Sequence, residues 1–143
     1  KYIVSRLKPD LFDKDFNERY SKWAKRVLWL DNSVVEGAFQ MNCSWYMKPS
    51  DQSTSQGNGH AHDCDEILGF FGSNPDDPHD LGGEIELWLE DEKHIITKSS
   101  MVFIPKGMKH CPLIIRRVDR PIFHFSTVTD GTYAQKKVVS ENQ

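Results

Sequence analysis

Most of the chain, from Val34 onward, is built of short runs in which apolar and polar residues alternate. Over 39–47, the residues Phe, Met, Cys, Trp and Met alternate with Gln, Asn, Ser and Tyr. A period of two is typical of a β-strand with one buried face. Further apolar runs follow, separated by Gly, Pro and Asp, at 66–72, 84–90, 93–98, 101–105, 111–118 and 121–128. Seven or eight short strands divided by turn residues predict an all-β protein, an antiparallel sandwich or barrel.

The N-terminal part has a different period. Phe16, Tyr20, Trp23 and Val27 follow one another at spacings of four, three and four, with Lys and Arg between them. This period is typical of an amphipathic helix, and Asp13 is a suitable N-cap. The pattern predicts a helix over 13–26 that covers one end of the sheet with its aromatic face, followed by a strand near 27–30.

At 143 residues the chain is long enough for one domain with its own hydrophobic core. We therefore expect an N-terminal helical and extended arm over 1–33 and a barrel over 34–128. The polar residues 129–143 are expected to form a loose tail or a strand exchanged with a partner.

Composition excludes several classes of function. The net charge is −3 and the basic residues are scattered, which disfavours nucleic-acid binding. No apolar run approaches the ~18–20 residues of a membrane span. The three cysteines, Cys43, Cys64 and Cys111, form no CxxC pair, which fits a reducing compartment. We therefore expect a cytoplasmic protein with no membrane and no nucleic-acid partner.

One stretch carries the chemistry. Residues 57–72 read GNGHAHDCDEILGFFG, and His110 follows a Pro-x-Gly turn in FIPKGMKHCPL. On a strand, His60 and His62 would project to the same side, and Glu66 has the same parity. Two imidazoles and a carboxylate, with His110 as a fourth donor, suit a divalent transition metal: Fe, Mn, Ni, Zn or Cu. A six-coordinate ion would keep two positions open for substrate, water or dioxygen.

These residues resemble the two motifs of the cupin superfamily. HAHDCDE followed by Gly72 is similar to the first motif, and PKGMKH at 105–110 is similar to the second, P-x-G-x-x-H. The resemblance implies a small single-domain metal-binding cupin, with a double-stranded β-helix (jelly-roll) barrel. It also implies that His60, His62, Glu66 and His110 are the metal ligands and that the protein is a homodimer.

Three further residues are candidates for the pocket. If Asp119 and Arg120 form a two-residue loop, His124 points away from the metal; a loop of odd length brings His124 into the pocket. Arg116 has the parity of His110 and can hold a carboxylate in bidentate fashion, although a solvated arginine is an equal alternative. Tyr46 lies on the strand before the histidines, on a face that alternation alone does not assign. By the same parity, Leu68, Phe70, Phe123 and Phe125 are expected as apolar walls.

The sequence therefore predicts a metal-dependent enzyme acting on a small oxygenated organic substrate. The two reaction classes are dioxygenation, and isomerisation, decarboxylation or lyase chemistry. The alternative is a cupin module that binds a metal or metabolite and catalyses nothing.

Overall fold

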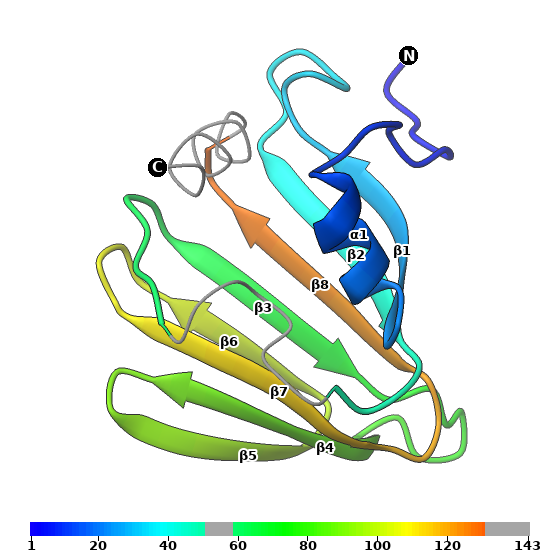
Figure 1. Cartoon of the computed structure of the whole chain (residues 1–143), viewed down its shortest axis with the longest axis vertical. Coiled ribbons are helices and arrows are strands. Elements are labelled where there is room, and N and C mark those ends of the chain that lie inside the picture. Colours follow the sequence, from blue (N-terminus) through cyan, green and yellow to red (C-terminus); the bar gives the residue numbers. More distant parts are fainter. Residues whose placement is uncertain (51–58, 131–143) are drawn as a thin grey trace.

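The computed structural model describes residues 1–50 and 59–130, which form one short helix and eight strands (Figure 1). In chain order these are α1 Lys14–Tyr20, β1 Ala24–Leu30, β2 Gln40–Tyr46, β3 Glu66–Phe71, β4 Asp80–Leu89, β5 Glu92–Lys98, β6 Ser100–Ile104, β7 His110–Val118 and β8 Ile122–Val128. The predicted all-β fold with a short N-terminal helix is confirmed.

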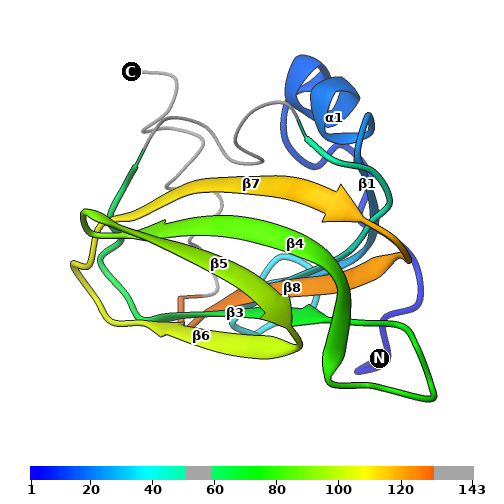
Figure 2. The ribbon, with the colours of Figure 1, turned by 90° about the horizontal axis from the view of Figure 1, so that it is seen from below.

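The strands form two antiparallel sheets that face each other (Figure 2). One has five strands in the order β1-β2-β8-β3-β6, and the other has three in the order β5-β4-β7. The space between them is filled by large apolar side chains that are at most 5% exposed, among them Leu68, Phe70, Leu81, Ile85, Leu87, Ile104, Ile115 and Ile122. The chain passes from one sheet to the other between β3 and β4 and again at each connection from β5 to β8, as in a jelly roll.

The helix is shorter than its sequence pattern predicts. It begins after Asp13, whose carboxylate accepts a hydrogen bond from the Phe16 amide at 2.8 Å, and it ends at Tyr20. The chain then enters β1 at Ala24, and Trp23 and Val27 therefore lie outside the helix. Pairing with β2 replaces the last helical turns, because tertiary hydrogen bonds outweigh a helical apolar pattern.

On β2 the polar residues face the interior. Gln40, Asn42, Ser44 and Tyr46 are all buried, whereas Met41, Cys43 and Trp45 lie on the other side of the sheet. The helix covers this polar inner face, since the Tyr20 hydroxyl donates a 2.8 Å hydrogen bond to the Ser44 hydroxyl. Sequence alternation alone left this choice of face open.

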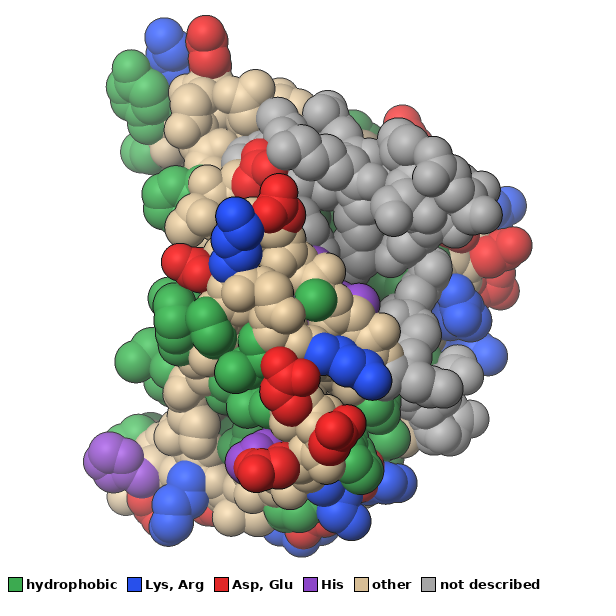
Figure 3. All heavy atoms as spheres, turned by 90° about the vertical axis from the view of Figure 1, so that its left-hand side faces the viewer, with side chains coloured by type: hydrophobic (Ala, Val, Ile, Leu, Met, Phe, Trp, Pro, Cys, Tyr) green, Lys and Arg blue, Asp and Glu red, His purple; other side chains and the backbone are tan. Residues whose placement is uncertain are grey.

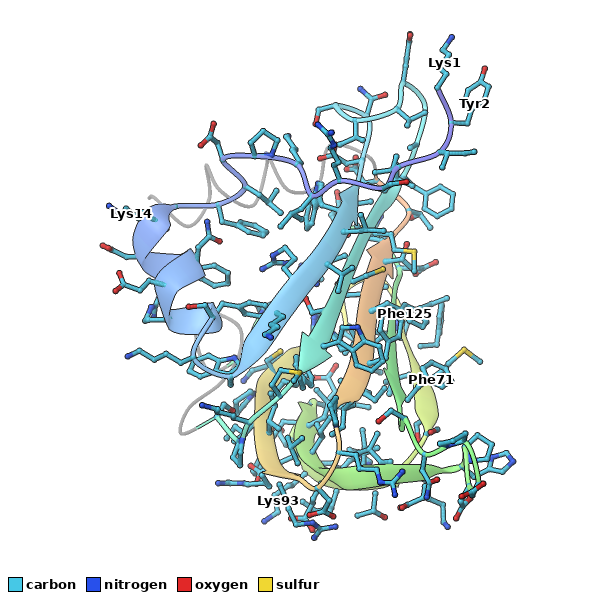
Figure 4. All side chains as sticks on the ribbon, turned by 90° about the vertical axis from the view of Figure 1, so that its right-hand side faces the viewer. Lys1, Tyr2, Lys14, Phe71, Lys93 and Phe125 are labelled. Atoms are coloured by element: carbon cyan, nitrogen blue, oxygen red, sulfur yellow. The ribbon has the colours of Figure 1, made fainter. Side chains whose placement is uncertain are left out.

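Of the four residues expected to form the apolar walls of the pocket, two face the core and two face outward. Leu68 and Phe70 point into the core, as predicted. The prediction was wrong for Phe123 and Phe125, which face outward: a Cβ on Gly69 would lie 2.1 Å from the Phe125 ring, and Phe125 stacks on Phe71 at 6.0 Å. Figure 4 shows Phe71 and Phe125 on the side of the sheet opposite α1. Three residues, 119–121, separate β7 from β8, and this odd number reverses the faces.

Within the described residues, no helix has the length and apolar character needed to cross a membrane.

Candidate metal centre

His60 and His110 lie directly opposite each other. They exchange two backbone hydrogen bonds, from His60 N to His110 O at 2.9 Å and from His110 N to His60 O at 2.8 Å. Residues paired in this way in antiparallel chains carry their side chains on the same side. The pairing is an isolated bridge, so the strand predicted at the histidines is reduced to one ladder step.

Further bonds join the two motif segments. The Gly107 amide donates to the His62 carbonyl at 2.9 Å, and the Lys106 amide donates to an Asp65 carboxylate oxygen at 2.8 Å. Gly107 has a φ of +87°, and the Met108 amide bonds back to the Pro105 carbonyl at 3.0 Å. A turn with positive φ at this position favours glycine, which explains the Pro-x-Gly sequence before His110.

These backbone contacts bring three imidazoles together. The ring centroids of His60, His62 and His110 are 4.4 to 4.7 Å apart. One ligand nitrogen from each ring lies within 4.8 Å of the others, so the three histidines can hold a metal ion. His110 is buried, and the other two are half-buried.

Glu66 borders the histidines. Its carboxylate oxygen Oε1 lies 3.0 Å from His110 Nε2 and 3.5 Å from His62 Nε2. Glu66 begins β3, where it pairs with Val128 on one side and with Ile104 on the other. The sheet therefore holds this carboxylate against the histidine-bearing loops.

The hydrogen bonding of His110 leaves two acceptors facing each other. His110 Nδ1 lies 3.2 Å from the Met108 carbonyl oxygen, which can only accept, so Nδ1 carries the proton and Nε2 has a lone pair. Nε2 and Glu66 Oε1 are both buried, and neither makes a hydrogen bond in the described structure. The 3.0 Å between them therefore requires a positive charge, from either a proton or a metal cation.

The electrostatics keep Glu66 ionised. Burial raises the pKa of Glu66, but the adjacent His110 and His62 rings lower it, and the result is a pKa of about 2. An ionised carboxylate beside three imidazoles is the donor set that a divalent transition ion prefers.

His124 lies inside the barrel. Its ring is stacked between Tyr46 and Phe70, with centroid distances of 4.8 and 4.9 Å, and its Nδ1 lies 3.0 Å from the Gly69 carbonyl. Nδ1 therefore donates, and Nε2 is an acceptor. Burial lowers the pKa of His124 to about 4, so the ring is neutral at pH 7. Of the two predicted orientations, the odd-length loop and the inward ring are the observed ones, and Tyr46 is also inside.

Arg116 is not in this group. It is exposed on the outer face of the three-stranded sheet, where its Nε and Nη2 donate to Glu86 Oε1 at 3.1 and 2.7 Å. The predicted parity was wrong because β7 pairs with β4 through two register shifts, which break the simple alternation between His110 and Arg116.

Arg26 lies on the inner face, which sequence reasoning missed. It is opposite Ser44 in the β1–β2 pairing, and its Nη1 donates to the Asn42 side-chain oxygen. The guanidinium lies 4.5 Å from the Tyr20 ring centroid and 4.9 Å from that of Phe12. In the expected helix Arg26 would have been on the solvated face, and only the strand assignment turns it inward.

No protein-family model matches the sequence, and no curated protein sequence matches it either. Solved structures do resemble the fold. A sugar phosphate isomerase from a cupin superfamily, from Silicibacter pomeroyi, aligns with a TM-score of 0.53 and 15% identity over 90% of this chain and 71% of that one. A cupin protein from Bacteroides fragilis aligns with a TM-score of 0.47 and 17% identity over 74% and 76%. A cupin domain from Schizosaccharomyces pombe aligns with a TM-score of 0.47 and 13% identity over 80% and 70%.

Two facing antiparallel sheets and a cluster of three histidines that can hold a metal ion define a jelly-roll protein. The chain has the cupin fold. At these identities the likeness establishes the fold alone, and the chemistry has to be argued from the residues.

Proposed function

We propose that the protein is a metal-dependent enzyme that acts on a small oxygenated organic molecule, with His60, His62, Glu66 and His110 as the metal ligands. The observation that carries the proposal is the buried pair of acceptors, His110 Nε2 and Glu66 Oε1, at 3.0 Å beside two more imidazoles. A proton would satisfy this one pair, whereas a cation would satisfy all four donors.

The spacing of this pair fits a metal ion. Two donor atoms that each lie about 2.1 Å from one ion, at a right angle, are roughly 3.0 Å apart. Three imidazole nitrogens and one carboxylate oxygen suit Fe, Mn, Ni, Zn or Cu. Once bound, such an ion supplies Lewis acidity and open positions for substrate oxygens.

The residues around the ligands define what the protein itself contributes. Leu68 and Phe70 give the interior an apolar wall that limits access of water. His124 is held in one tautomer by the Gly69 carbonyl, so its Nε2 can accept a proton or a hydrogen bond. Tyr46 stacks on His124 and fixes the plane of its ring.

The reaction belongs to one of two classes. Dioxygenation consumes oxygen, whereas isomerisation, decarboxylation and lyase chemistry do not. The structural neighbour named as a sugar phosphate isomerase supports including phosphorylated sugars among the test substrates.

The test is metal-dependent turnover. Metal-free protein would be reconstituted separately with each of the five ions and incubated with diketones, catechols, keto acids and phosphorylated sugars. Substrate loss by NMR and oxygen uptake would be recorded together. We expect turnover with at least one ion and its loss on chelation. Tight ligand binding without turnover by any metal form would contradict the proposal that the protein is an enzyme and would favour a binding module.

A further inference from the structure

Arg26 is a half-buried cation, and no carboxylate of the described residues lies beside it. Its contacts are the Asn42 side-chain oxygen and the rings of Tyr20 and Phe12, and none of its contacts in the described residues is an acidic group. Burial lowers the pKa of Arg26, which reflects the cost of removing its charge from water. Burying an unpaired charge is expensive, so a missing anion would explain the arrangement.

The neighbouring inner-face residues provide further hydrogen-bonding groups. Gln40 is 4% exposed, and its side chain makes no hydrogen bond to the described residues. Ser126 pairs with Asn42 on one side and with Leu68 on the other, so it lies between Asn42 and the strand that begins at Glu66. Together Arg26, Asn42, Gln40 and Ser126 form a polar surface, which we call the inner polar face.

This face lies within reach of the metal ligands. Asn42 on β2 and Glu66 on β3 are two strands apart, because β8 lies between them, and they are offset by two residues along the strands. Their backbones are therefore roughly 12 Å apart. His124 lies on β8 between Ser44, which pairs with Arg26, and Phe70, which is on the same strand as Glu66. A molecule several bonds long can therefore contact both ends.

We propose that Arg26 binds an oxyanion group, a carboxylate or a phosphate, at the end of the substrate remote from the metal. The inference rests on the proposed function and names its substrate class: small organic anions. A guanidinium presents paired donors that match these groups, and Asn42 together with the Tyr20 ring holds it in place.

The experiment measures anion binding by calorimetry on the metal-loaded protein, for Arg26→Gln, Arg26→Lys and the unmutated chain. The probes are pyruvate, malate, glycerol phosphate and inorganic phosphate, with glycerol as the neutral comparison. We expect at least one anion to bind, with about tenfold to hundredfold weaker binding in Arg26→Gln and a smaller loss in Arg26→Lys. Arg116→Gln is the matched control, because Arg116 lies on the outer face, and its affinity should equal that of the unmutated chain.

The metal content of each variant separates the two proposals. An unmutated protein that takes up no metal contradicts the proposed function. A metal-loaded protein whose anion affinity is unchanged in Arg26→Gln, or which binds none of the four anions, overturns the role of Arg26. A melting curve for each variant confirms that the comparison is made on folded protein.

A second observation, independent of the site, concerns the opposite side of the five-stranded sheet. The strand pairings place Leu28, Cys43, Phe125 and Met101 in one row, Leu30, Met41, Thr127, Ile67 and Phe103 in a second, and Trp45, Phe123 and Phe71 in a third. Lys25, which pairs with Trp45, is the one charged residue that the pairings place in these three rows. We call this surface the outer face.

Much of this apolar surface is open to solvent. Met101 is 71% exposed, Phe103 59% and Ile67 37%, and Phe39 and Met47 continue the alternation at the ends of β2 with 58% and 37%. At about 200 Å² for a fully exposed large side chain, these five alone present on the order of 500 Å². Figure 3 shows hydrophobic side chains gathered along its left-hand edge, where this sheet is seen side on.

We infer that the outer face binds the outer face of a second copy of the chain. With its half-buried neighbours, the surface approaches the roughly 800 Å² per partner of a standard interface, and it exceeds the patch left open on most monomers. A nearly uncharged flat face is complementary to itself, which is the requirement for a two-fold dimer.

Light scattering after size-exclusion chromatography tests this inference. We expect the unmutated chain to be a dimer at about 10–100 µM, and Phe103→Lys to be a monomer with an unchanged melting temperature, because Phe103 is already exposed. Ile95→Lys, at a 48% exposed position on β5 of the other sheet, should remain dimeric. A monomeric unmutated chain, or a Phe103→Lys variant that stays dimeric, overturns the inference.

Discussion

Replacing Glu66 by glutamine is expected to weaken metal binding by about a hundredfold or more, because a neutral amide is a weaker ligand for a divalent ion than a carboxylate. The Glu66 carboxylate lies 3.0 Å from His110 Nε2 and 3.5 Å from His62 Nε2, and although burial raises its pKa, these rings lower that pKa to about 2. The amide loses this favourable contact, so the metal-free variant is expected to be no more stable than the unmutated protein.

The measurement pairs metal titration with thermal melting in chelator. Glu86→Gln is the matched control, because Glu86 is also buried but bonds to Trp88 and Arg116 on the other sheet. It should bind metal normally. If Glu66→Gln kept full metal affinity, Glu66 would not be a ligand.

Replacing Gly72 by alanine is expected to destabilise the fold by about 4 kcal/mol or more and to lower the melting temperature by more than about 10 °C. A Cβ at Gly72 would lie 1.8 Å from the Asp80 carbonyl oxygen, which belongs to the backbone at the start of β4. The overlap cannot be relieved by a side-chain rotation, so the end of β3 or the start of β4 must move.

Denaturant unfolding of Gly72→Ala and Ser73→Ala gives the comparison. Ser73 is the next residue, exposed, and its hydroxyl donates one hydrogen bond to the Pro121 carbonyl, so its loss should cost about 1 kcal/mol. Equal stability of the two variants would show that the contact between β3 and β4 is looser than described.

The strands could be predicted from the sequence because their alternation and turn residues are local features. The runs that begin at Glu66, Lys93 and Met101 each fall within one or two residues of an observed strand. The run expected to begin at Glu84 starts earlier, since β4 begins at Asp80. Its Gly82 and Gly83 are strand residues held close to other backbone segments, which a reading of glycine as a turn residue does not reveal.

The face of the sheet on which a residue lies was harder to predict. It depends on the exact number of residues in each loop and bulge before that residue. One extra residue between β7 and β8 turned His124 inward and Phe125 outward. The bulge between Arg26 and Leu28 likewise hides the inward position of Arg26 from any fixed period. The histidine cluster was predicted with less difficulty, because two short motifs carry it and backbone pairing of His60 with His110 joins them.

The most direct test of the metal centre is elemental analysis of protein prepared without affinity-tag metal, then reconstituted with each of the five ions. We expect about one equivalent of metal in the unmutated chain and less than about a tenth of that in His60→Ala and His110→Ala. His94→Ala, at an exposed position on β5, should keep the full amount. An unmutated protein that binds no ion, or histidine variants that bind as much as it does, would contradict the assignment of this cluster as a metal site.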